Sequence, residues 1–146
     1  MASIRQQIID ILDIELKKIK KANGFNTDAG KNVFAWRDNP LTKPELPGLI
    51  YRDALNRKFS VSPIGKFRWA LRIEVAVFGT SANEVRAGLE DVLKVIGICE
   101  ETKWGNNAQD TLLADGDEMA VEKYDIETGA AILTFEVVYD TNKWSM

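Results

Sequence analysis

The segment from Lys66 to Phe78 alternates between apolar and polar positions along its whole length. One set of alternate positions holds Phe67, Trp69, Leu71, Ile73, Val75 and Val77, and the other holds Lys66, Arg68, Ala70, Arg72 and Glu74. Successive side chains of a strand point to opposite faces, so this pattern predicts a long strand with one face in the core. The opposite face lies in water or against a partner, which favours antiparallel pairing.

Two segments carry the pattern of amphipathic helices, each introduced by a capping box. The first follows Ser3-Ile4-Arg5-Gln6, has isoleucines and leucine at helical spacing, and is expected to run from about Ser3 to Ala22 before Asn23-Gly24. The second follows Ser81-Ala82-Asn83-Glu84, and Gly97 lies near its expected end. Its apolar stripe consists of Val85, Leu89, Val92 and Ile96.

The remaining strands are shorter or interrupted. Short strands are expected at Val33–Trp36 and at Leu49–Tyr51, the latter extended by Phe59–Val61. A hairpin is expected from Glu118–Ile126 and Ala130–Tyr139, joined by a turn at Glu127-Thr128-Gly129. The polar stretch Glu100–Asp117 reads as a long loop or a weak strand. Between the first two strands, Asp38–Gly48 holds Pro40, Pro44 and Pro47, which predicts an extended arm or a loop rather than a central strand.

These elements give the order α-β-β-β-α-β-β. Because runs of strands separate the helices, the expected class is α+β, with a mainly antiparallel sheet, two helices packed on one face and the extended proline-containing arm. The length of 146 residues predicts one domain over residues 1–146.

Composition excludes several kinds of chemistry. The chain has no histidine and a single cysteine, Cys99, so Ser–His and Cys–His nucleophiles, an intrachain disulfide and cysteine-based zinc clusters are ruled out. The net charge of −3 gives no basic excess for nucleic acid. We therefore expect no enzyme and no cofactor. No secretory segment or membrane span is visible, which predicts a soluble protein made in the cytoplasm.

Four groups of residues are candidates for chemistry, each with a plainer alternative. The acidic stretch Asp110–Glu118, with Asp115 and Asp117, reads as a solvated turn, and weak divalent-cation binding is the minority view because the spacing is not that of a calcium loop. The cluster Lys17–Lys21 suits the end of a helix dipole better than an anion or nucleic-acid patch. Cys99 is expected to be buried and unreactive. Arg68, Arg72 and Glu74 form either a charge-balanced wet face or an intersubunit contact, with equal weight.

The element order resembles the tail terminator proteins of long-tailed bacteriophages, of the lambda-like type. Three stretches carry the resemblance, and with the opening helix they cover nearly the whole chain: Glu45-Leu46-Pro47-Gly48-Leu49-Ile50-Tyr51, Trp69-Ala70-Leu71-Arg72-Ile73-Glu74-Val75, and Ala130-Ala131-Ile132-Leu133-Thr134-Phe135-Glu136-Val137-Val138-Tyr139. None of these strings is a catalytic fingerprint.

The resemblance implies a minor tail protein that closes the tail tube as a hexameric ring, stops polymerisation and offers a head-joining surface. Its implied partners are copies of itself, the tail tube protein and a head-side connector protein, while DNA passes without specific binding. The protein would be assembled in the host cytoplasm and reside in the virion tail. The expected interface residues are Arg68, Arg72, Glu74, Leu41, Pro44 and Leu46, with Leu41 and Leu46 anchoring the arm on a neighbour.

Two other functions stay open. A small nucleic-acid-binding accessory protein would use Lys17–Lys21 with Arg68 and Arg72. A metal-dependent enzyme would use Asp110, Asp115, Asp117 and Glu118.

Overall fold

The structure, a computed structural model, describes residues 3–37, 39, 41–61, 64–113, 122–123 and 129–145. Its helices are α1 (Ile4–Leu16), α2 (Ala82–Glu101) and the short α3 (Lys103–Asn106). Its strands are β1 (Val33–Ala35), β2 (Gly48–Val61), β3 (Phe67–Gly79), β4 (Asp110–Leu113), β5 (Glu122–Lys123) and β6 (Gly129–Thr141).

The strands form one sheet in the order β1-β2-β3-β6-β4, with β5 also paired to β6. All pairs are antiparallel except β1 with β2, which is parallel, so the sheet is mixed. The predicted α+β class is confirmed, and the parallel edge strand is the feature that the prediction of a mainly antiparallel sheet did not include.

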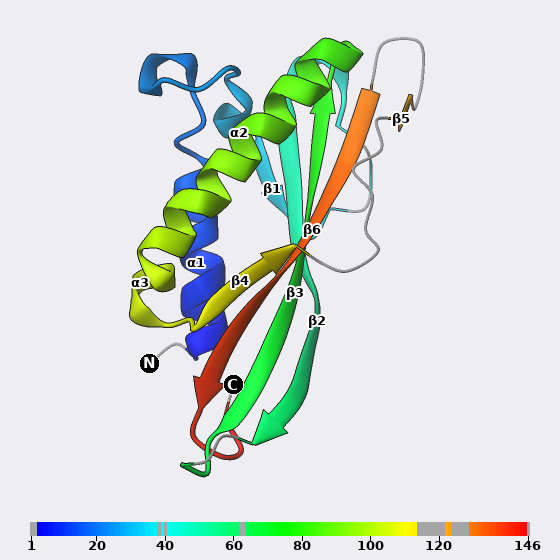
Figure 1. Cartoon of the computed structure of the whole chain (residues 1–146). Coiled ribbons are helices and arrows are strands. Elements are labelled where there is room, and N and C mark those ends of the chain that lie inside the picture. Colours follow the sequence, from blue (N-terminus) through cyan, green and yellow to red (C-terminus); the bar gives the residue numbers. More distant parts are fainter. Residues whose placement is uncertain are drawn as a thin grey trace.

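Helices α1 and α2 lie side by side on one face of the sheet (Figure 1). The predicted inward positions of β3 are buried there: Leu71, Ile73 and Val75 have no exposed surface. α2 approaches β3 closely at Gly88, where an added Cβ would lie 2.6 Å from Val77 Cγ1. The alternation of β3 and both capping serines, Ser3 and Ser81, are therefore confirmed.

The two main helices end at other places than expected. α1 stops at Leu16 rather than at Ala22, because Ile19 turns into the core and its carbonyl accepts a 2.8 Å hydrogen bond from the Gly30 N–H. α2 instead continues through Gly97 to Glu101, since one exposed glycine costs a long packed helix only about 1 kcal/mol.

The proline-containing segment is not an extended arm in its described part. Leu41 is buried on the sheet face opposite the helices, in a small cluster with Ile50, Phe78 and Ala130. Residues Lys43–Glu45 form a 3-10 turn, and Arg37 fixes it through two hydrogen bonds of 2.6 and 2.7 Å to Glu45. The segment thus packs on its own chain. Asp38 and Pro40 lie outside the described residues.

The sheet extends past the helices at one end. β2 is a continuous strand of 14 residues, rather than two short pieces, and β1 pairs with it only at Leu49, Ile50 and Tyr51. Residues 52–61 of β2, the first half of β3 and the last part of β6 project as a three-stranded ribbon (Figure 1). β4 occupies part of the predicted polar loop and pairs with β6 as an edge strand.

Candidate functional site

The outer face of the sheet, opposite the helices, carries a row of cross-strand ion pairs. Arg68 on β3 holds Asp140 on β6 with hydrogen bonds of 2.7 and 3.0 Å. Arg72 lies 3.9 Å from Glu136 of β6, and Arg52 of β2 donates to Glu74 at 2.9 Å. We refer to these six residues as the charge row.

The predicted interface residues Arg68, Arg72 and Glu74 therefore share one face, as the alternation required. Each is joined to an oppositely charged residue of its own chain, a pattern that fits the charge-balanced interpretation. The Arg68 guanidinium lowers the pKa of Asp140, and its hydrogen bonds to that carboxylate are the largest cause. Contact of this face with a neighbouring subunit stays a prediction.

The lysine cluster lies in the helix layer, on the other side of the sheet. Lys17 and Lys18 pair with Asp13 and Glu15 at 2.8 and 2.9 Å. Helix α1 ends at Leu16 with Lys17 as its C-cap, so the lysines follow the helix end and do not occupy its final turns as expected. The basic residues of the nucleic-acid alternative thus lie on two faces and do not form one surface.

The proposed arm anchors differ in exposure. Leu41 retains 3% of its exposed surface and already packs in its own chain, and Leu46 is partly buried beside it. Pro44 is exposed on the 3-10 turn. Of these three residues, Pro44 is the one available for contact with another molecule.

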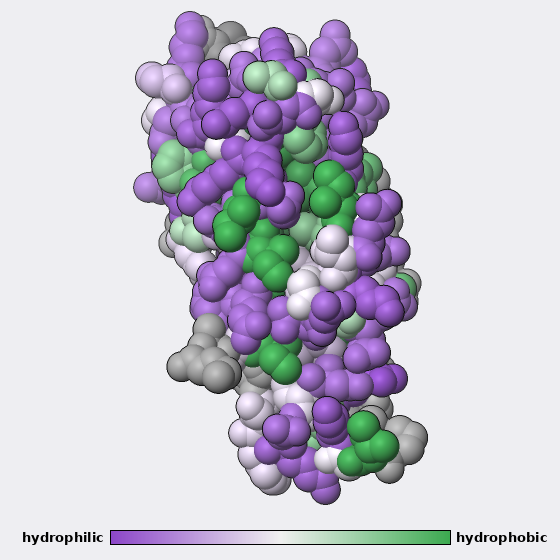
Figure 2. All heavy atoms as spheres, turned by 90° about the vertical axis from the view of Figure 1, so that its left-hand side faces the viewer, coloured by the Kyte–Doolittle hydropathy of each residue, from purple (hydrophilic) through white to green (hydrophobic). Residues whose placement is uncertain are grey.

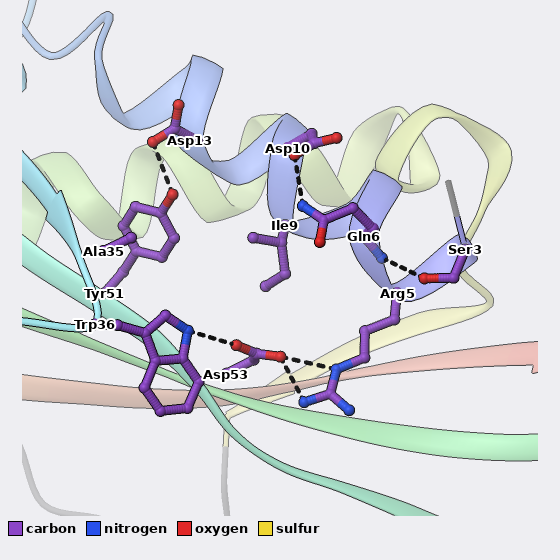
Figure 3. Close-up of a pocket in the computed structure, with 10 residues that line it drawn as sticks. All are labelled: Ser3, Arg5, Gln6, Ile9, Asp10, Asp13, Ala35, Trp36, Tyr51 and Asp53. Atoms are coloured by element: carbon purple, nitrogen blue, oxygen red, sulfur yellow. Dashed lines mark hydrogen bonds and ion pairs between the residues drawn. The ribbon is translucent and has the colours of Figure 1, made fainter. Parts of the chain in front are cut away.

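A groove that sequence reasoning missed lies between α1 and the β1–β2 edge of the sheet (Figure 3). Its volume is about 480 Å³. It is lined by Ser3, Arg5, Gln6, Ile9, Asp10, Asp13, Ala35, Trp36, Tyr51 and Asp53. The three segments that form it are distant in sequence, so no local pattern marked it.

Hydrogen bonds fix the polar groups of this groove. Asp53 accepts from the Arg5 Nε at 2.8 Å and from the Trp36 Nε1 at 3.1 Å (Figure 3). Tyr51 donates its hydroxyl to Asp13 at 2.7 Å, and burial together with Asp13 raises the pKa of Tyr51. Trp36 remains 62% exposed and has a left-handed backbone with φ of 57°. The groove presents an indole face beside three carboxylates and one guanidinium, which suits a cationic and apolar group.

The other candidate residues from the sequence do not form a reactive or metal-binding site among the described residues. Cys99 is buried, as expected, and burial raises its pKa to about 12, so the thiol stays protonated at neutral pH. Asp110 is exposed at the start of β4, and Asp115, Asp117 and Glu118 lie outside the described residues. Within the described part of the chain, no group of three or more Asp, Glu or Cys residues is placed to hold a metal ion.

No helix in the described ranges is long and apolar enough to cross a lipid bilayer. No family model matches the chain, and no curated protein matches it. Among solved structures, the chain is similar to a chain of the virion of a native gene transfer agent particle, with 10% identity and a TM-score of 0.45. The match covers 95% of this chain and 92% of that chain. At this level it describes a general likeness of chain path and nothing finer.

Proposed function

We propose that this protein is a virion assembly protein that caps the tail tube of a long-tailed bacteriophage as a hexameric ring. The observation that carries the proposal is the outer face of the long sheet. Among the described residues, segment 41–47 packs on this face, and together with Arg37, which lies over the Phe34 ring, it covers one end. The charge row lies on the uncovered remainder, beside an edge of β2 that β1 leaves unpaired from residue 52 onward. An open sheet face with an open edge is a surface for assembly with other chains.

The element order supports the same proposal. A helix, three strands, a capped helix and the closing strands follow one another along the chain in the order on which the resemblance to tail terminator proteins rests. In this role the protein has no catalytic task, and its partners are its own copies, the tail tube protein and a head-side connector. The net charge of −3 per chain lets DNA pass through the ring without being held by its phosphates.

Nucleic-acid binding is the second candidate, and the charge arrangement disfavours it. Lys17 and Lys18 lie with their carboxylate partners in the helix layer, whereas Arg68 and Arg72 lie with theirs on the outer sheet face. A phosphate backbone would have to displace these partners on two separate surfaces.

Two measurements test the proposal. Light scattering and negative-stain images of the purified protein, alone and with tail tubes, should show rings that sit on tube ends. In an infected cell, removal of the protein should yield abnormally long tails that fail to join heads. Tails of normal length that join heads would contradict the proposal, and salt-sensitive DNA binding in its place would support the second candidate.

A further inference from the structure

The free end of the three-stranded ribbon carries exposed apolar side chains. Ile64, in the turn between β2 and β3, is 77% exposed, and Trp144, just after β6, is 88% exposed. Figure 2 shows hydrophobic atoms at this lower end of the molecule. Lys143 is exposed at the same end and gives it a positive charge, and Lys66 is exposed there close enough to Asp140 to lower the pKa of that carboxyl group. We refer to Ile64, Lys66, Lys143 and Trp144 as the tip.

The tip holds its tryptophan in a defined position. Trp144 packs edge-on against Phe67 with ring centroids 5.3 Å apart, and Phe67 packs in the same way on Trp69 at 6.1 Å. Thr141 accepts from the Trp69 Nε1 and donates to the Ser145 carbonyl, which ties the chain after β6 to the sheet. A large side chain that is exposed yet ordered loses little conformational entropy on binding, which is the property of an interface anchor.

The groove beside α1 complements this tip in charge and in chemistry. Its carboxylates, Asp10, Asp13 and Asp53, outnumber its single guanidinium, Arg5, and because Lys17 pairs with Asp13, an excess of one negative charge remains. Its walls also offer Ile9, Ala35 and the exposed face of Trp36. A volume of about 480 Å³ lies within the range of about 300–1,000 Å³ that is common for binding clefts.

Both sites carry the same kind of backbone strain. Trp36 and Trp144 have φ values of 57° and 63°, in the left-handed region that disfavours a side chain. In each case the residue with the strained backbone is itself the tryptophan, and its side chain lies at the surface. Strain that persists at exposed aromatic residues is common at ligand clamps and contact sites.

We infer that the tip of one copy docks into the groove of a second copy, with Trp144 against Trp36 and Lys143 beside Asp10. The inference rests on the proposed function and specifies the contact by which its subunits join. Because tip and groove are different surfaces of each chain, the contact is heterologous, and an open assembly keeps one free tip at one end and one free groove at the other until the ring closes.

The contact is tested by sedimentation velocity over a concentration series. Trp144→Ala and Trp36→Ala should each weaken self-association at least tenfold, while Leu93→Ala, which removes a 41% exposed side chain of α2, should leave it unchanged. Lys143→Glu and Asp10→Lys should each weaken association, and the two changes together in one chain should restore it. Circular dichroism and thermal melts establish that every variant is folded.

Mixing two defective variants gives a sharper result. A Trp144→Ala chain keeps its groove and a Trp36→Ala chain keeps its tip, so an equimolar mixture should form dimers and no larger species. If the wild type assembles and all these variants assemble equally well, the tip–groove contact is wrong and the proposed ring stands. If the wild type remains a monomer at every concentration and on tube ends, the proposed function fails as well.

Discussion

Glu45 is a residue whose ionisation the fold changes in the acidic range. Hydrogen bonds from Arg37, and then from the Thr42 N–H and hydroxyl, lower its pKa to about 2. An unfolded glutamate has a pKa of about 4.3, so folding favours the ionised form. The resulting stabilisation is fully present above about pH 4.3 and is lost as the pH falls towards 2.

Glu45→Gln should therefore remove part of the acid sensitivity of the fold. Denaturant midpoints of the wild type should fall more steeply than those of the variant between about pH 4.3, the unfolded pKa, and about pH 2, the folded pKa. An NMR titration of the Glu45 carboxyl group gives the folded pKa directly. Parallel pH profiles of the two proteins would contradict the role of this carboxylate.

Asp91 shows how one buried side chain holds a loop that has no regular structure. It lies on α2 with 2% exposure and accepts hydrogen bonds from the Asn26 N–H, the Thr27 N–H and the Thr27 hydroxyl at 2.7–2.9 Å. Asp91→Ala leaves these donors without partners and should cost about 3 kcal/mol of unfolding free energy.

The neighbouring carboxylate provides the control. Glu90 is exposed and accepts only from the Asn26 side chain, so Glu90→Ala should change stability by no more than about 0.5 kcal/mol. Urea unfolding of both variants measures the difference. Equal losses would mean that the loop is held by contacts other than Asp91.

At the scale of elements, α2 contains two glycines in opposite environments. An added Cβ at Gly88 would lie 2.6 Å from Val77 Cγ1, a buried branched side chain of β3, whereas at Gly97 it would meet no atom within 4 Å. Gly88→Ala should force the helix away from the sheet and cost about 1–3 kcal/mol. Gly97→Ala should stabilise the protein by about 0.5–1 kcal/mol, because alanine is the better helix former. Thermal unfolding should shift the two melting temperatures in opposite directions, and a shift in the same direction would contradict this packing of α2.

The sequence correctly predicted the features that depend on residues close together in the chain. Period-two alternation placed Leu71, Ile73 and Val75 in the core, and the side chains of Ser3 and Ser81 cap their helices. The errors have non-local causes. α1 ends early because the Gly30 N–H, eleven residues further on, donates to the Ile19 carbonyl, and segment 41–47 packs inward because β2, β3 and β6 offer it an apolar surface.

At the scale of the whole molecule, the sequence predicted one residue of each ion pair in the charge row but not its partner. Alternation put Arg68, Arg72 and Glu74 on one face, but their partners Asp140, Glu136 and Arg52 depend on the register of β3 with β6 and with β2. That register emerges only from the assembled sheet. The groove beside α1 needs three separate segments, so no local pattern in the sequence marks it.

Two effects of the charge row are tested separately. One is the stability that its ion pairs give to the sheet within one chain, and the other is its effect on ring formation between chains. Arg72→Glu brings two carboxylates opposite each other at Glu136, so it should lower both stability and ring formation. The double variant with Glu136→Arg restores opposite charges within the chain and should recover the wild-type melting temperature.

The same double variant reverses the sign pattern that a neighbouring subunit would meet on this face. Charge pairs across an interface set register and specificity more than affinity. A neighbouring subunit whose charges complement the charge row should therefore still bind the double variant less well. We therefore expect stability to recover while ring formation, measured by light scattering at low salt, stays below the wild type. Addition of salt should narrow the difference, because screening weakens exposed charge pairs. If the double variant assembles as well as the wild type, the charge row stabilises only its own sheet, and ring formation depends on other surfaces.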